Sequence, residues 1–171
     1  MEIYYTDIDE FKKQTSRDFL ETYNDIGLKN EKRFFEYTIG RYLVKTVAKE
    51  VYNLKNTDII LNYKGKPVFK DEKLCFNITH SKNMLVACFD DNPVGIDIEF
   101  IKNKDLSKLS KYFKQDFKDL EDFYKYWTNK EALYKLGQKA QSTRFFKFEN
   151  DYYISVASSK EVEIPYPIKY N

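Results

Sequence analysis

Histidine and cysteine are scarce in this sequence, which has one histidine, His80, and two cysteines, Cys75 and Cys88. Both cysteines lie in apolar runs typical of β-strands, so we expect buried thiols in a reducing compartment rather than a disulfide framework. A structural zinc site needs clustered histidine and cysteine ligands, and the sequence offers no such cluster. Zinc-stabilised and disulfide-rich folds are therefore not expected.

Long apolar runs and a strong net charge are also missing. No stretch is long and apolar enough for a transmembrane helix, and the first residues, MEIYYTDIDE, lack the basic and then apolar pattern of a signal peptide. We therefore expect a cytoplasmic protein that does not enter a membrane. The net charge of +2 is not typical of a general nucleic-acid binder, so a charged partner must be bound by a local patch.

Aromatic residues, in contrast, are abundant. The chain has 15 tyrosines and 14 phenylalanines, and its aromatic share is 18%. So many rings have to pack against one another, which indicates a folded protein. A length of 171 residues is enough for one domain or for two small halves with a shared core.

The pattern of apolar residues predicts both helices and strands. Helical spacing occurs at residues 7–23, 30–51, 107–114 and 116–137. Strand-like runs occur at residues 74–79, 84–89, 94–100, 143–148 and 152–157. Because only short turns separate the first three strands, we expect an antiparallel meander. The order predicts an α+β fold, with an N-terminal half over residues 1–100 and a C-terminal half over residues 101–171.

The stretch VGIDIEFI, residues 94–101, has a strand pattern with two acids on one face. Asp97 and Glu99 are two residues apart, so they point to the same side, about 6.6 Å apart along the strand. They can therefore bind one hard cation such as Mg²⁺, which prefers carboxylate oxygens and commonly bridges to phosphates. The alternative is a solvent-facing strand edge with two ordinary acids.

The helical segment YWTNKEALYKLG, residues 126–137, adds a second set of charged groups. Trp127, Glu131 and Lys135 are spaced four residues apart and share one ridge, with Lys130 beside them. Glu131 can complete a three-carboxylate site, while Lys130 and Lys135 can bind phosphate oxygens. The alternative is a surface pair of Glu131 and Lys135, worth roughly a few tenths of a kcal/mol.

The segment FNITHS, residues 76–81, places a histidine between two hydroxyl groups at the end of a strand. Thr79, His80 and Ser81 are suitable hydrogen-bond donors to a phosphate. A lone histidine also commonly has a structural role, so that interpretation stays open.

Together these segments resemble the 4′-phosphopantetheinyl transferases, specifically the monomeric surfactin-synthetase type. That family has a GKP turn, a strand ending in N-x-hydroxyl-H-S, a GIDIE strand and a W-(S/T)-x-K-E-x-x-x-K helix, in this order. The matching segments here are residues 65–67, 77–81, 95–99 and 127–135. The resemblance implies a monomer of two similar α+β halves, related by a pseudo-two-fold axis, with the active site in the cleft between them.

The resemblance also implies a role for each matching residue. It assigns the binding of Mg²⁺, which in turn binds the pyrophosphate of coenzyme A, to Asp97, Glu99 and Glu131. It assigns coenzyme A contacts to Lys66 and Pro67 at the adenine end and to Thr79, His80 and Lys135 at the phosphates. Lys32 and Arg33 lie in the region where the family has basic residues for the 3′-phosphate.

The implied activity is that of a holo-[acyl-carrier-protein] synthase. A serine of an apo carrier protein attacks the β-phosphate of coenzyme A, receives the 4′-phosphopantetheine group, and 3′,5′-adenosine bisphosphate leaves. Serine is a poor nucleophile, so a base must take its proton. Glu131, with Lys130 beside it, is our first candidate, and Asp116 is the second. Fatty-acid, polyketide and nonribosomal peptide carriers all remain possible substrates.

Several lysines recur at helical spacing between the GIDIE strand and the helical segment at residues 126–137, and we call them the basic stripe. Its proposed docking residues are Lys104, Lys108 and Lys111. Because carrier proteins of this kind are typically acidic around their serine, we expect the stripe to form part of a docking face. The alternative is an ordinary solvated helix face.

Two other functions would also use these acids. One is another magnesium-dependent phosphoryl or nucleotidyl transferase. The other is a catalytically silent homologue that binds coenzyme A or a carrier protein without turnover.

Overall fold

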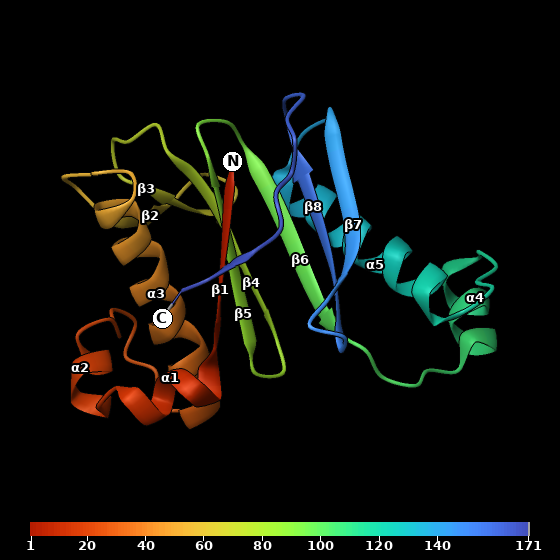
Figure 1. Ribbon diagram of the computed structural model, residues 1–171, viewed down its shortest axis with the longest axis horizontal. Coiled ribbons are helices and arrows are strands. Elements are labelled where there is room, and N and C mark those ends of the chain that lie inside the picture. Colours follow the sequence, from red (N-terminus) through yellow and green to blue (C-terminus); the bar gives the residue numbers. More distant parts are fainter. Residues whose placement is uncertain (171) are drawn as a thin grey trace.

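The computed structural model describes residues 1–170, which form an α+β structure, and the predicted fold class is confirmed (Figure 1). What we call the N-terminal sheet has the order β4(Cys75–Ser81), β5(Met84–Asp90), β1(Glu2–Asp7) and β9(Ile168–Lys169). The C-terminal sheet has the order β6(Val94–Phe100), β8(Tyr152–Ser158) and β7(Ser142–Phe148). A separate hairpin pairs β2(Ile59–Leu61) with β3(Pro67–Phe69).

The helices of the first half confirm one prediction and correct another. The long helix α3(Glu31–Glu50) begins after Asn30, whose side chain accepts a hydrogen bond from the backbone of Arg33, as expected. The helix predicted over residues 7–23 is instead two helices, α1(Ile8–Gln14) and α2(Arg17–Glu21). The break occurs because the Ser16 side chain caps the second helix, so the chain leaves helical geometry there.

The predicted meander is wrong in its third strand. Strands β4 and β5 form the expected antiparallel hairpin, but the other neighbour of β5 is β1, which lies some eighty residues away along the chain. Strand β6 pairs instead with β8. The physical reason is that both edges of β5 are already used by β4 and β1, so β6 extends into a different sheet. The division of the chain near residue 100 stays a prediction.

The helices of the second half lie close to the predicted ranges. Helix α4(Leu106–Phe113) agrees with the prediction for residues 107–114. Helix α5(Leu120–Leu136) begins four residues later than expected, because the side chain of Asp119 caps it by accepting from the backbone of Asp122. It ends where predicted, at Gly137, whose φ of 75° is the left-handed conformation that glycine adopts freely.

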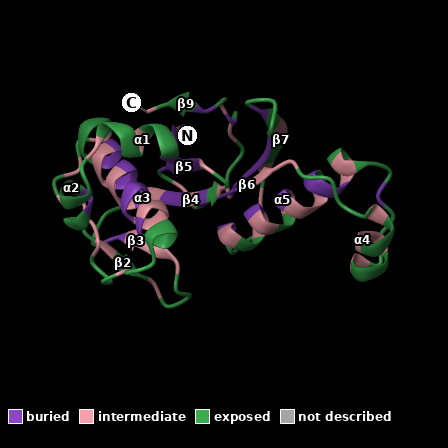
Figure 2. Ribbon diagram, turned by 90° about the horizontal axis from the view of Figure 1, so that it is seen from below, coloured by how far each residue is buried: buried purple, intermediate pink, exposed green. Residues whose placement is uncertain are grey.

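Residues 1–170 contain four buried apolar clusters, of which the two largest lie on the N-terminal sheet and between the two sheets. Helix α3 packs on one face of the N-terminal sheet, and Phe34, Leu43 and Phe89 are among the fully buried residues there. The second core joins residues of the N-terminal sheet to strand β6 and its neighbours, and it includes Ile164 of the C-terminal segment. Figure 2 shows burial running through α3, β5 and β6, whereas α4 has no buried residue and lies at one end of the molecule.

Among residues 1–170, no helix combines the length and the apolar character needed to cross a membrane.

Candidate functional site

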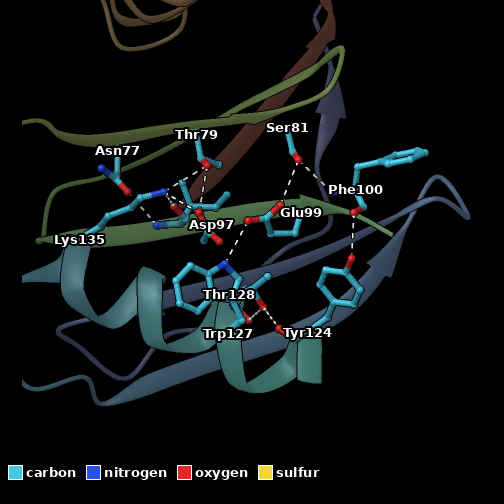
Figure 3. A network of polar contacts seen from close by, with 12 residues as sticks. Asn77, Thr79, Ser81, Asp97, Glu99, Phe100, Tyr124, Trp127, Thr128 and Lys135 are labelled. Carbon is cyan, nitrogen blue, oxygen red and sulfur yellow. Dashed lines mark hydrogen bonds and ion pairs between the residues drawn. The ribbon is translucent and has the colours of Figure 1, made fainter. Parts of the chain in front are cut away.

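The candidate site is built on a seam between β4 and β6, which lie side by side but belong to different sheets. Alternate residues of β4 point towards β6, and their side chains replace backbone pairing (Figure 3). The Asn77 side chain accepts from the backbone N–H of Ile96 at 2.9 Å. The Ser81 hydroxyl accepts from that of Phe100 at 3.0 Å. These two bonds fix how β6, and therefore its acids, are aligned along β4.

Asp97 lies in the centre of the seam, where it contacts Lys135 and Thr79. The Lys135 ammonium of α5 is 2.7 Å from Asp97 Oδ1 and also donates to the hydroxyl of Thr79 at 3.1 Å. The same ammonium donates to the backbone carbonyl of Ile96 at 3.1 Å. Thr79 in turn donates to Asp97 Oδ1 at 3.2 Å. The structure therefore brings together three residues that the sequence analysis assigned to one site.

The second oxygen of Asp97 has no hydrogen-bond partner among the described residues, although it is fully buried. Burial raises the pKa of the Asp97 carboxyl to about 6, against the opposing effect of the neighbouring Lys135 ammonium. A buried carboxylate oxygen without a partner is costly. A divalent cation would satisfy this oxygen, so the Asp97 carboxylate fits the predicted metal.

Glu99 is the second acid of the seam, and both of its oxygens are bound. The indole N–H of Trp127 donates to Oε1 at 3.0 Å, and the hydroxyl of Ser81 donates to Oε2 at 3.2 Å. One residue of β4 and one of α5 thus hold the carboxylate in a fixed orientation (Figure 3). The predicted ridge of α5 is confirmed for Trp127 and Lys135, which reach the two acids from the same helix.

Gly95 explains why α5 can lie so close to β6. A Cβ atom built on this residue would be 2.0 Å from the Ala132 carbonyl oxygen and 2.6 Å from the Leu136 nitrogen. Only a residue without a side chain allows this approach. The glycine of the GIDIE strand thus has a packing role that places the helix over the acids.

A buried hydroxyl pair beneath the site was not identified from the sequence. Thr128 lies 2.7 Å from the Ser155 hydroxyl of β8 and donates to the backbone carbonyl of Tyr124 at 2.7 Å. The Tyr124 hydroxyl in turn accepts from the backbone N–H of Lys102 at 2.9 Å. One sign of this pair was present in the sequence, because Thr128 stands at the Ser/Thr position of the W-(S/T)-x-K-E motif. Its partner Ser155 could not be identified, because β8 is distant along the chain.

The structure does not gather all of the predicted catalytic groups around one point. Glu131 is half-buried on α5, and residues 1–170 contain no group of three acids, histidines or cysteines close enough to hold a metal ion. Lys130 is exposed, with its ammonium 5.4 Å from the ring centroid of Phe113. Asp116 is exposed in the connection between α4 and α5. The catalytic roles of these residues stay predictions.

Four of the residues predicted to bind coenzyme A line one cavity of about 510 Å³ between α3, β3 and β4: Arg33, Pro67, Thr79 and His80. Most of its other lining residues are apolar. His80 Nδ1 is 3.6 Å from a carboxylate oxygen of Glu36. The cavity therefore combines a mostly apolar wall with two arginines, one histidine and one acid, Glu36.

Arg41 also lines this cavity and was missed by the sequence analysis. Its guanidinium donates to the Tyr37 hydroxyl at 2.9 and 2.8 Å, and Tyr37 donates to Asp25. Arg33 and Arg41 are eight residues apart and share a face of α3. That spacing was the available signal. Lys32, in contrast, lies outside the cavity, 3.7 Å from Glu36.

Lys66, predicted at the adenine end of coenzyme A, does not line this cavity but lines a neighbouring one together with Pro67 and Lys135. Its ammonium donates to the backbone carbonyls of Val94 at 2.8 Å and Lys135 at 2.9 Å, and its role in coenzyme A binding stays a prediction. Burial lowers the pKa of this ammonium.

The lysines of the predicted docking face are exposed. Lys108 lies 3.5 Å from Asp105, and the Lys104 ammonium is 5.4 Å from the ring centroid of Phe123. Lys111 is exposed in the last turn of α4. The stripe is accessible to a partner, and its docking role stays a prediction.

The fold and the seam thus define an α+β protein that positions two acids and a lysine beside a cavity of about 510 Å³. No family model matches the chain. It is 36% identical over 117 residues to the 4′-phosphopantetheinyl transferase psf-1 of Bacillus pumilus. The aligned region covers 61% of this chain and 50% of the relative. The chain is 33% identical over 117 residues to the 4′-phosphopantetheinyl transferase Sfp of Bacillus subtilis, with coverage of 61% and 52%.

A third relative is the 4′-phosphopantetheinyl transferase HetI of a Nostoc species, which is 26% identical over 144 residues, or 70% of this chain and 61% of the relative. By sequence, the chain is similar to these 4′-phosphopantetheinyl transferases. The chain spans about half the length of the first two relatives that it matches.

Proposed function

We propose that this protein transfers the 4′-phosphopantetheine group of coenzyme A to a serine of an apo carrier protein. The observation that carries the proposal is the seam itself. Asp97 has a buried oxygen without a partner, Glu99 is held beside it, and Lys135 reaches the same acid from α5. The names of the relatives agree with this chemistry.

Asp97 and Glu99 would hold a magnesium ion, with Glu131 as the proposed third ligand. When bound, the ion would neutralise charge on the pyrophosphate of coenzyme A. Lys135 is positioned to donate to a phosphate oxygen, because its ammonium already lies at the seam. Trp127 and Ser81 keep Glu99 oriented, so the site needs little rearrangement to accept its ligands.

Coenzyme A would occupy the cavity between α3, β3 and β4. Its apolar wall suits the adenine ring, while Arg33 and His80 at the rim suit the phosphates. Thr79 lines this cavity and also donates to Asp97. That shared residue connects the nucleotide cavity to the acids of the seam, as the proposed reaction requires.

The reaction forms one bond and breaks one. The serine oxygen of the carrier forms a bond to the β-phosphorus, while the bond from this phosphorus to its bridging oxygen breaks. 3′,5′-Adenosine bisphosphate leaves with that oxygen. Glu131 takes the serine proton, with Asp116 as the second candidate base. Lys130 and Lys135 stabilise the charge that develops on the phosphate oxygens.

The carrier would be an acidic acyl or peptidyl carrier protein that docks on Lys104, Lys108 and Lys111. We further propose that the enzyme acts as a cytoplasmic monomer with two similar halves and its active site between them. The seam between β4 and β6, with the nucleotide cavity on one side, supports this arrangement.

The test is intact-protein mass spectrometry of apo carrier proteins after incubation with the protein, coenzyme A and Mg²⁺. We expect a mass gain of one phosphopantetheine, which a chelator or Asp97→Ala abolishes. Asp91→Ala is the matched control, because Asp91 is an exposed acid in the nearby turn. No gain on any fatty-acid, polyketide or peptide carrier, with a folded protein that binds coenzyme A, would instead indicate a catalytically silent homologue.

A further inference from the structure

The side chain of Lys66 connects two elements that are distant along the chain. Its ammonium donates to the carbonyl of Val94, in the first position of β6, and to that of Lys135, in the last turn of α5. Both bonds are shorter than 3 Å. The β2–β3 connection of the first half thereby contacts the strand that carries the acids and the helix that carries Lys135.

The end of a helix is the place where a cation is most effective. The last carbonyls of an α-helix have no partner within the helix, and its C-terminus carries a partial negative charge. Here Lys66 binds the carbonyl of Lys135, and Lys64 donates to that of Gly137 at 3.3 Å. Lys66 therefore caps the last turn of α5, whereas the longer contact of Lys64 is made beyond the end of the helix.

The backbone of α5 and that of β6 approach most closely at the same level. Gly95 directly follows Val94, and the atoms nearest to its missing Cβ belong to Ala132 and Leu136. At this point no side chain of β6 separates the strand from the helix. The ammonium of Lys66 binds both backbones beside that contact, so it can fix their relative position.

The position of this helical turn decides where the Lys135 ammonium lies. The backbone carbonyl of Lys135 is bound by Lys66, and its side chain reaches Asp97, Thr79 and Ile96. Any movement of this turn along β6 would change the distance from the ammonium to Asp97, which is 2.7 Å.

We infer that Lys66 is a positioning residue, which clamps the last turn of α5 to the start of β6 and so holds Lys135 at the seam. Its ammonium donates to two backbone carbonyls, one of β6 and one of α5. The catalytic consequence rests on the proposed function, whereas the clamp itself is a property of the fold.

Three variants separate the clamp from other roles. Lys66→Met keeps the aliphatic stem and removes the ammonium. Lys66→Arg keeps a cation that can donate to two carbonyls. Lys64→Met is the matched control, because Lys64 belongs to the same connection but is exposed, and its ammonium contacts the Gly137 carbonyl and the Tyr63 ring but neither β6 nor Lys135 among the described residues. Each variant is measured at a temperature where urea unfolding shows it to be fully folded.

For Lys66→Met we expect kcat to fall roughly tenfold to a hundredfold, since small misplacements of catalytic groups have effects of this size. The dissociation constant for coenzyme A, measured by calorimetry, should rise by a smaller factor than kcat falls, because Lys135 is only one of several groups proposed to bind coenzyme A. Lys66→Arg should restore part of kcat, and Lys64→Met should remain close to the unaltered protein. An unchanged kcat for Lys66→Met, or a loss of coenzyme A affinity as large as the loss of kcat, would overturn the inference.

Hydrogen–deuterium exchange tests the clamp without any activity. Amides of residues 132–137 should exchange faster in Lys66→Met than in the unaltered protein, and Lys64→Met should have a smaller effect. This measurement remains decisive if no carrier is modified, because it does not depend on the reaction. Equal exchange of this segment in Lys66→Met and in the unaltered protein would overturn the clamp even if transfer activity is found.

Discussion

At the residue scale, the seam depends on side chains that act in fixed pairs. Glu99 is held by Trp127 and Ser81, while Asp97 keeps one oxygen without a protein partner. The pattern of two acids on one strand face was readable from VGIDIEFI, because strand geometry alone places them on the same side. The resemblance placed Thr79 and Lys135 in the same site, but the contacts of Glu99 with Ser81 and Trp127 were not predicted. Local rules contain no information on which distant strand or helix lies opposite.

Gly95 gives the sharpest prediction at this scale. Gly95→Ala should lower the free energy of unfolding by about 3 kcal/mol or more, because the new methyl group overlaps the backbone of α5 and cannot be accommodated by a side-chain rotation. The measurement is urea unfolding followed by circular dichroism.

The matched control is Gly27→Ala. Gly27 has a φ of 65° and nothing within 4 Å of its missing Cβ, so this change should cost only about 1 kcal/mol of backbone strain. Equal losses for the two variants would mean that α5 can move away from β6, contrary to the packing described here.

At the element scale, the segment after β8 links the two sheets. The side chain of Arg144, on β7, donates to the carbonyl of Ile164, and β9 pairs in parallel with β1. Strands β1, β2, β3 and β9 were not predicted. Three of them have only two or three residues, which is too short for an alternating pattern to be recognised. Their partners across the sheet, not their own sequence, stabilise them.

Ile164 tests how much this segment contributes. Ile164→Ala should lower the free energy of unfolding by about 2–4 kcal/mol, because the side chain is only 4% exposed within the second core. Ile168→Ala is the control on the same segment, since Ile168 is 53% exposed and should change stability by less than about 0.5 kcal/mol. If Ile164→Ala lowered the free energy of unfolding by less than about 0.5 kcal/mol, the segment would be dispensable for stability.

At the scale of the whole molecule, the charge is nearly balanced, so electrostatic capture of a partner has to come from one surface. Lys108→Glu with Lys111→Glu should lower kcat/KM for an acidic carrier about tenfold at low salt, with a smaller effect at high salt. The assay uses saturating coenzyme A and varies the carrier concentration and the salt.

The control for this prediction reverses the same amount of charge elsewhere. Lys55→Glu with Lys70→Glu alters two exposed lysines in the N-terminal half, and we expect little change in kcat/KM. If both double variants behave alike, the effect comes from net charge and the stripe has no docking role.

The sequence by itself determined the α+β class, the main helices and the identity of the two seam acids, because these follow from local periodicity and capping. Only the tertiary structure decided that β6 leaves the first sheet for the second, that Lys66 binds the end of α5, and that Arg41 lines the cavity. Each of these depends on elements that lie far apart along the chain. Only the packing of all the elements decides which strand edges are free to pair. The same packing decides which backbone carbonyls are left for a side chain such as Lys66 to bind.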